Sequence, residues 1–123
     1  MTVIENYKTA IDKSDENLFK EAFAPQVRIE IPSGAGADYP ANTASYILSQ
    51  VAKTAPGIRC FLTADAGDGW HLLAFEGQKL QAIDQLHLNK DGTIDQIVIY
   101  MRPIPVAQRF GEVIMQRLQP ARQ

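Results

Sequence analysis

The stretch WHLLAFEGQKLQAIDQLHLNKDGTIDQIVIYMRP, residues 70–103, decides the fold of this chain. Turn residues divide it into three segments, each rich in the aromatic and branched apolar residues that are typical of strands. Gly77-Gln78 fits a two-residue hairpin turn, and the residues from Asn89 to Gly92 fit a second turn. The stretch therefore predicts two consecutive antiparallel hairpins, with strands at residues 70–76, 79–88 and 94–102.

The hairpin turns predict which residues face one another. A two-residue turn pairs Glu76 with Lys79, whose opposite charges favour the same register. Counting outward from both turns places His71 and Ile97 opposite Asp84. Alternation then puts Asp84 on the more aliphatic face of the sheet, which we expect to point toward the helices. The other residues of this face are His71, Leu73, Phe75, Leu80, Ala82, Leu86, Ile97, Ile99 and Met101.

The opposite face of the three strands is too apolar for a surface exposed to water. Leu72 and Val98 lie on it, together with Trp70, Ile83 and Tyr100. A contiguous apolar patch of this kind favours contact with a second copy of the chain. We therefore expect a homodimer that forms through this outer sheet face.

The N-terminal part of the sequence predicts two helices and a strand. Thr2 and Glu5 have the spacing of a capping box, so a helix begins at the start of the chain. A second short helix at residues 18–23 ends before a proline. Residues 27–31 alternate apolar and charged side chains, as half-buried strands do. Residues 33–40 are small and turn-rich, and we expect them to form a loop.

The remaining segments complete an α+β pattern. Asn42 or Thr43 can cap a third helix that ends at Pro56-Gly57, and residues 59–64 and 106–118 predict a strand and a final helix. Helices followed by mostly antiparallel strands indicate a curved sheet wrapped around the N-terminal helices. We expect a cystatin-like cone with a central pocket, formed by a single domain over residues 1–123.

Composition excludes several classes of function. The 123 residues are 46% hydrophobic and carry a net charge of −2 with scattered Lys and Arg, so no basic surface for nucleic acid is expected. Cys60 is the single cysteine, which gives neither a disulfide framework nor metal-ligand spacing. No run approaches the roughly 20 apolar residues of a membrane span, and residues 1–24 lack the pattern of a signal peptide. We expect a cytoplasmic protein with no membrane partner, metal or cofactor.

The order of elements resembles the nuclear transport factor 2-like superfamily, and its SnoaL-like polyketide cyclase and ketosteroid isomerase branches in particular. The stretches that carry the resemblance are IDQLHLNKDGTI at residues 83–94 and YMRP at 100–103, and the likeness covers nearly the whole chain. It implies that Asp84 stands where ketosteroid isomerases place the acid of their oxyanion hole, and Tyr7 where they place its hydroxyl partner. Ile31 stands at the position of their general base and cannot accept a proton, which argues against the same mechanism.

Two chemical interpretations of Asp84 remain open. A neutral Asp84 beside Tyr7 could stabilise the oxygen of a bound carbonyl group. An ionised Asp84 could instead orient His71, which would then move a proton as general acid and base. Epoxide hydrolases of the superfamily use acids bridged by a buried arginine, and no such arginine is expected on the inner face.

The sequence therefore predicts a domain that binds a small hydrophobic molecule in a cone-shaped pocket. One hypothesis is a cofactor-independent isomerase, cyclase or hydratase in which Asp84, His71 and Tyr7 perform acid–base chemistry. The alternatives are a non-catalytic ligand carrier and a module that only dimerises. The side chains expected to contact the ligand are Phe19, Phe23, Ile31, Leu73, Phe75, Leu86, Ile97, Ile99 and Met101.

Overall fold

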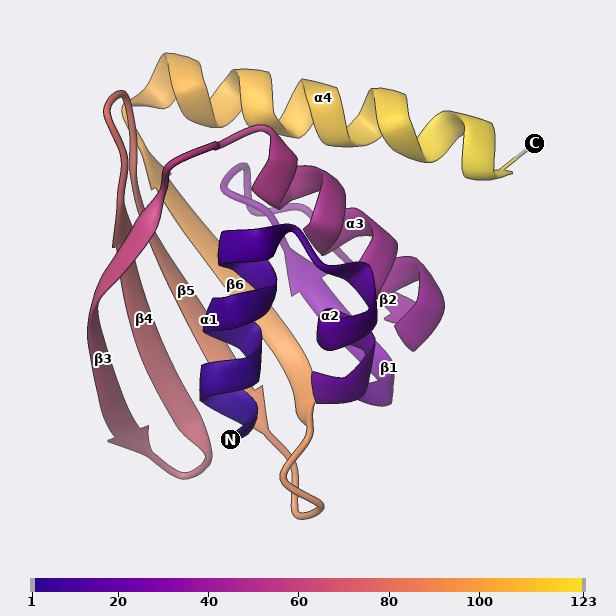
Figure 1. Cartoon of the computed structure of the whole chain (residues 1–123). Helices are drawn as coiled ribbons and strands as arrows, with labels where there is room; N and C mark the ends of the chain where they lie inside the picture. The colour runs from indigo at the N-terminus through magenta and orange to yellow at the C-terminus, as the bar shows by residue number, and fades with distance from the viewer. Residues whose placement is uncertain (1, 123) are drawn as a thin grey trace.

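A computed structural model describes residues 2–122, with side chains described at 2–112, 115 and 116 (Figure 1). Four helices and six strands follow one another along this part of the chain. In order they are α1 (Val3–Lys13), α2 (Glu16–Ala22), β1 (Phe23–Glu30), β2 (Gly36–Pro40), α3 (Ala41–Lys53), β3 (Arg59–Gly67), β4 (Trp70–Glu76), β5 (Gln81–Leu88), β6 (Ile94–Arg102) and α4 (Ile104–Arg122).

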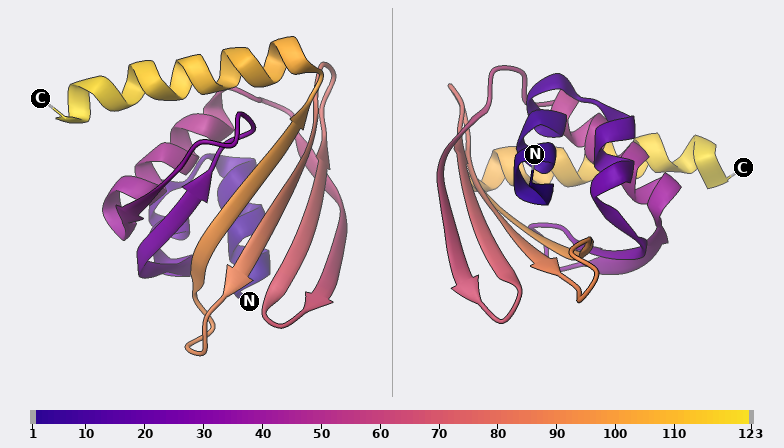
Figure 2. Two further views of the ribbon diagram at one scale, coloured as in Figure 1. Left: turned by 180° about the vertical axis from the view of Figure 1, so that it is seen from behind. Right: turned by 60° about the horizontal axis from the view of Figure 1, so that its bottom comes forward.

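The six strands form one curved sheet in the order β2-β1-β6-β5-β4-β3. Neighbouring strands are antiparallel except β1 and β6, which run parallel. The sheet curls around α1, α2 and α3, while α4 crosses one end of the strands (Figures 1 and 2). The predicted α+β cone is confirmed. No helix in the described range combines the length and hydropathy needed to cross a bilayer.

The predicted capping box starts the first helix. The backbone N–H of Glu5 donates to the Thr2 hydroxyl, and the Thr2 N–H donates to the Glu5 carboxylate. Ser14 ends α1 in the left-handed conformation, and Asp15 caps α2 by accepting two backbone hydrogen bonds. These caps fix the turn between the two helices, which leaves Tyr7 of α1 facing the sheet in the core.

We expected residues 33–40 to form a loop, but the structure shows that this segment also contains a strand. Its second half forms β2, which pairs with β1 and places Val27 opposite Tyr39. Small residues and a proline are compatible with a strand at a sheet edge, because one side of an edge strand makes no ladder hydrogen bonds. Exposed and half-buried residues also alternate along β2, as they do in strands. The composition of the segment does not show this alternation.

The third helix begins earlier than predicted, and neither Asn42 nor Thr43 is its N-cap. Pro40 occupies that position and makes no side-chain capping bond. Pairing between β1 and β2 continues to Gln26 and Pro40, so the helix begins directly after the strand ends. Strand pairing here outweighs the preference of about 1 kcal/mol that asparagine and threonine have for the N-cap.

Two other boundaries also differ from the predicted ones. β3 continues past Ala64 as far as Gly67, where it pairs with the start of β4. α4 begins at Ile104, before the expected Val106, and reaches Arg122. Both elements are longer than their apolar residues alone indicate, since strand pairing and helix continuation do not need an apolar side chain at every position.

The register of the first hairpin is shifted by two residues from the predicted one. Glu76 lies opposite Gln81 rather than Lys79, so the connection comprises residues 77–80. The backbone N–H of Gly77 donates to the Leu80 carbonyl across this turn at 2.9 Å. Glu76 instead pairs with Arg59 of β3, at 2.8 Å. The ion pair that we expected to fix the turn therefore lies on the other side of β4.

Beyond an irregularity between Leu88 and His87, the second hairpin is shifted by the same amount, and Asp84 lies opposite Ile99 instead of Ile97. Because side chains alternate with a period of two, a shift by two residues leaves every side chain on its predicted face. Asp84 accordingly points inward and is 6% exposed. Among the described side chains it is the one charged group in the core, which is otherwise formed by apolar residues and two helical serines.

Candidate functional site

The candidate site is built around a hydrogen bond between the first helix and the fifth strand. The Tyr7 hydroxyl donates to Oδ2 of Asp84 at 2.7 Å. Tyr7 has no exposed surface, and its ring packs edge-on against Phe19 with the ring centroids 5.5 Å apart. The capped start of α1 and the pairing of β5 between β4 and β6 hold the two groups in place. The expected proximity of Tyr7 and Asp84 is therefore present in the fold.

Burial changes the proton affinity of both groups. Loss of water around Asp84 raises its pKa from 3.8 to about 6, although the hydrogen bond from Tyr7 opposes this effect by stabilising the charged form. Burial also raises the pKa of Tyr7 well above its usual value of 10, and the nearby Asp84 carboxylate raises it further. At neutral pH the pair is consequently a neutral tyrosine that donates to a mostly ionised carboxylate.

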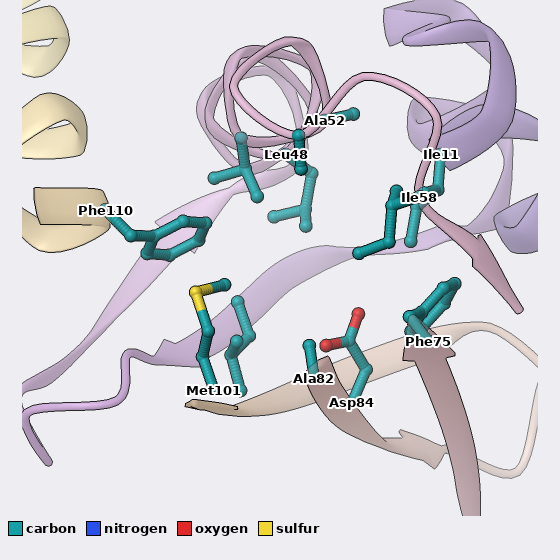
Figure 3. Close-up of a pocket in the computed structure, with 12 residues that line it drawn as sticks. Ile11, Leu48, Ala52, Ile58, Phe75, Ala82, Asp84, Met101 and Phe110 are labelled. Carbon is teal, nitrogen blue, oxygen red and sulfur yellow. The ribbon is translucent and has the colours of Figure 1, made fainter. Parts of the chain in front are cut away.

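Asp84 lines a small pocket between the sheet, α1, α3 and α4. Figure 3 shows its carboxylate pointing from β5 into this space. The pocket encloses about 40 Å³, enough for water or a small polar group. Every other described side chain that lines it is apolar. These residues are Ile11, Leu48, Val51, Ala52, Ala55, Ile58, Phe75, Ala82, Ile99, Met101 and Phe110.

One oxygen of Asp84 remains available to a ligand. Oδ2 accepts the hydrogen bond from Tyr7, and no other hydrogen bond to Asp84 exists among the described residues. The described side chains also contain no buried nitrogen or oxygen atom that lacks a partner. Oδ1 is thus not sealed in the core, and it can reach a molecule that enters the pocket.

His71 does not pair with Asp84, and this expectation was wrong. The shifted register places His71 opposite Leu86, while Leu73 lies opposite Asp84. His71 lines a different cavity, beside Thr2 and Asp65 at the other end of the strands. The error follows from the turn, because a connection two residues longer moves every cross-strand partner by two positions.

The other histidine of the chain, His87, does have a carboxylate partner, which we had expected for His71. Nδ1 of His87 lies 2.6 Å from Oδ1 of Asp95, and the indole of Trp70 packs on the imidazole with ring centroids 4.9 Å apart. Residues 87 and 95 flank the β5–β6 turn, so the pair joins its two strands on the outer face. The described part of the chain holds no group of three His, Cys, Asp or Glu side chains suited to a metal ion.

Only some of the residues expected to contact a ligand line the Asp84 pocket. Phe75, Ile99 and Met101 do so. The other predicted side chains fill the interior of the cone around Tyr7 or pack at its edge, so they support the pocket from outside. They are Phe19, Phe23, Ile31, Leu73, Leu86 and Ile97.

The pocket residues that sequence reasoning missed lie mainly on helices. Ile11, Leu48 and Val51 belong to apolar helix faces that the sequence does reveal, and Phe110 belongs to the last helix. Periodicity shows that such a face is buried. It does not show which side chains of that face border a cavity, because this depends on how the helix crosses the sheet.

Comparison with known proteins identifies the fold. No protein-family model and no curated protein sequence matches the chain. Among solved structures, an uncharacterised protein with a cystatin-like fold from Silicibacter pomeroyi superposes with a TM-score of 0.86 at 21% identity, over 98% of this chain and 88% of that one. A steroid delta-isomerase from Pseudomonas aeruginosa gives a TM-score of 0.81 at 22% identity, over 97% and 90% of the two chains.

A third similar structure is SalBIII, an epoxide hydrolase/cyclase-like enzyme of pyran ring formation in the polyether salinomycin. It superposes with a TM-score of 0.62 at 20% identity, over 81% of this chain and 88% of that one. The chain therefore has the cystatin-like cone of the nuclear transport factor 2-like proteins, as its sequence resemblance implied. Identities at this level establish the fold, and the chemistry has to be argued from the site.

Proposed function

We propose that this protein binds a small hydrophobic molecule in the cone and transfers a proton on it through Asp84, as a cofactor-independent isomerase, cyclase or hydratase does. The observation that carries the proposal is a single ionisable group in an otherwise apolar pocket, held by the 2.7 Å hydrogen bond from Tyr7. A lone carboxylate is costly on such a surface. Perturbed acids in clefts are frequently functional groups.

The pKa of Asp84 suits a proton acceptor. A general base works best when its pKa lies near the working pH, because it is then ionised and still basic enough to take a proton. With a pKa of about 6, Asp84 meets this condition at neutral pH. Of the two roles left open by the sequence, the ionised carboxylate is favoured over a permanently neutral hydrogen-bond donor.

The proposed step begins when a substrate places a C–H bond next to a carbonyl group near Oδ1 of Asp84. The C–H bond breaks as an O–H bond forms on Asp84, and the electron pair moves to the substrate oxygen as an enolate. Tyr7, which has no exposed surface, keeps its hydrogen bond to Oδ2, and the new O–H group of Asp84 can donate to the enolate oxygen until the proton is returned. In a β,γ-unsaturated substrate the enolate is conjugated with the C=C bond, so return of the proton to the γ-carbon shifts the double bond into conjugation with the carbonyl group, restores the carboxylate and gives the isomer.

His71 has no part in this proposal, since it lines another cavity. Ile31 also supplies no base, as its side chain cannot accept a proton. Asp84 would therefore act both as the general base and as the acid of the oxyanion hole. The resemblance implies that two separate acids have these roles in ketosteroid isomerases. The steroid delta-isomerase and SalBIII support the reaction class in general terms, because both are named for chemistry on this fold.

A second candidate function is ligand binding without turnover. It is favoured by the lining of the Asp84 pocket, where every residue except Asp84 is apolar. Such a pocket can hold a molecule by burial of its surface and by one hydrogen bond to Asp84. The two candidates share the same site and differ in whether the bound molecule exchanges a proton.

We also propose that the protein forms a homodimer through the outer face of the sheet. Three large apolar side chains on this face are strongly exposed in the single chain, at 57% for Leu62, 43% for Ile83 and 51% for Tyr100. They come from β3, β5 and β6, so they extend across the sheet. A second copy would remove this apolar surface from water.

Proton transfer can be tested without knowing the natural substrate. Small ketones such as cyclopentanone are incubated with the protein in heavy water, and exchange of the protons next to the carbonyl is followed by NMR. We expect the wild-type protein to accelerate exchange and Asp84→Asn to reduce the acceleration by about 100-fold or more. Binding without any accelerated exchange would support the carrier instead, and unchanged exchange in Asp84→Asn would remove the catalytic role.

A further inference from the structure

A larger cavity adjoins the Asp84 pocket on the side of α4. It encloses about 410 Å³, and we call it the outer cavity. Met101 and Phe110 line both spaces and so separate them. Figure 3 shows these two side chains next to one another at one side of the Asp84 pocket. The outer cavity is lined by Thr54, Lys79, Leu80, Met101, Val106, Arg109 and Phe110.

Among the described residues, those that line the outer cavity carry two positive charges and no negative one. Lys79 lies in the β4–β5 connection and Arg109 lies on α4, so two separate elements bring the cations to one space. Neither forms an ion pair with any described side chain, and no acidic residue lines the cavity. The Thr54 hydroxyl already donates to the Val51 carbonyl at 2.6 Å. The polar groups left to recognise a ligand are therefore an ammonium and a guanidinium group.

We propose that the outer cavity is the entrance to the site and that the ligand is an oxo acid, whose carboxylate binds Lys79 and Arg109 while its ketone group reaches Asp84. This inference rests on the proposed function, since it assumes that ligands bind beside Asp84. Guanidinium and ammonium groups are the usual protein partners of carboxylates, and arginine can hold both oxygens at once.

Charge along the path favours one orientation of such a molecule. An anionic group next to the Asp84 carboxylate would be repelled in a space of low polarity, where charges interact more strongly than in water. The same group is attracted by the two cations of the outer cavity. An oxo acid therefore binds with its neutral carbonyl end inward and its carboxylate at the mouth, which places the acidic C–H bonds near Asp84.

The volumes of the two cavities fit an oxo acid whose ketone end lies beside Asp84 and whose carboxylate lies in the outer cavity. The Asp84 pocket, at about 40 Å³, has room for a small group such as an acetyl end. The outer cavity, at about 410 Å³, can hold the chain that joins it to the carboxylate. Met101 lies at the boundary, and a flexible, unbranched methionine side chain can change rotamer as a ligand passes.

The test compares 6-oxoheptanoate with its methyl ester, which has the same ketone end and no charge. Affinities are measured by NMR titration at low ionic strength, where charge interactions are least screened. The variants are Lys79→Gln with Arg109→Gln together, Lys90→Gln as a matched control, and Asp84→Asn. Lys90 belongs to the β5–β6 connection and is not among the residues that line the outer cavity. Circular dichroism confirms that each variant is folded.

We expect the wild-type protein to bind the acid about 10-fold more tightly than the ester, with the preference falling as salt is added. The double variant should lose this preference, and Lys90→Gln should keep it. Equal affinities of acid and ester for the wild-type protein, or a preference that survives in the double variant, would overturn the oxo acid assignment alone. Exchange of the ester's protons next to the ketone in heavy water that the wild-type protein and Asp84→Asn accelerate equally would count against the proposed function itself, and no binding of either probe would overturn both.

Discussion

The Tyr7 hydroxyl donates to Asp84 across a separation of 77 residues, at 2.7 Å in the interior of the cone. The contact joins the first helix to the fifth strand, so it forms only when the sheet has closed around the helices. It also keeps a carboxylate in an apolar core, where the raised pKa of about 6 records the cost of burial. Stability and proton chemistry therefore depend on the same bond.

Asp84→Asn should stabilise the fold at high pH. The folded pKa of about 6 lies above the ordinary value of 3.8, so ionisation of Asp84 opposes folding. Below the unfolded pKa Asp84 is neutral in both states, and its ionisation does not affect the free energy of unfolding. As the pH rises to and through the folded pKa, the cost of burying the ionised carboxylate lowers the free energy of unfolding. The full difference corresponds to about 3 kcal/mol above that range. We expect urea denaturation to show Asp84→Asn more stable than wild type near pH 8 and closely similar near pH 4.

Tyr7→Phe should have the opposite effect on stability. It removes the one hydrogen bond that the described residues make to the buried carboxylate, and an unsatisfied buried polar group costs about 1–3 kcal/mol, more when it is charged. We expect the loss in the free energy of unfolding to be larger near pH 8 than near pH 4. Tyr39→Phe is a matched control, because the Tyr39 hydroxyl makes no hydrogen bond among the described residues. Equal losses in the two variants would contradict the assigned role of Tyr7.

Charge on the outer sheet face should prevent dimerisation. Leu72→Lys or Val98→Lys places an ammonium group in the apolar surface that we propose is covered by a second copy. Analytical ultracentrifugation should show a dimer for the wild-type protein and a monomer for each variant. Ile104→Lys is the control, since Ile104 is 72% exposed but lies on α4 outside the sheet. A monomeric wild-type protein would end this proposal.

Gly69→Ala should destabilise the fold more than Gly92→Ala. Both glycines have positive φ, at 84° and 77°, so alanine is strained at either position. A Cβ atom at Gly69 would lie 2.7 Å from the Leu88 carbonyl oxygen, whereas at Gly92 it would meet nothing within 4 Å. We expect a loss of about 1 kcal/mol for Gly92→Ala and about 2–3 kcal/mol for Gly69→Ala, measured by urea denaturation. Similar losses would show that the contact with Leu88 is unimportant.

The inward position of Asp84 was predictable, although the details of strand pairing were not. Both hairpins are shifted by two residues, and an even shift preserves the faces that alternation assigns. The turns at residues 77–80 and 89–92 contain several residues that accept turn conformations, so composition does not determine their length. His71 lost its predicted role for this reason alone.

The helical side of the pocket was less predictable. Phe75, Ile99 and Met101 followed from strand alternation, which fixes the side of the sheet on which a residue lies. Leu48 and Phe110 depend on how α3 and α4 pack over the sheet, and nothing local in the sequence records that packing. The edge strand β2 was missed for a similar reason, because its pairing with β1 rather than its composition makes it a strand.

The most direct test of Asp84 as the proton acceptor is its own titration, followed through the chemical shift of its side-chain carboxyl carbon in the wild-type protein. We expect a midpoint near pH 6, because burial raises the pKa of Asp84 more than the Tyr7 hydroxyl lowers it. The same titration in Tyr7→Phe should move the midpoint higher still. A wild-type midpoint at or below the ordinary aspartate value of 3.8 would mean that Asp84 is solvated, and the proposed proton acceptor would not exist.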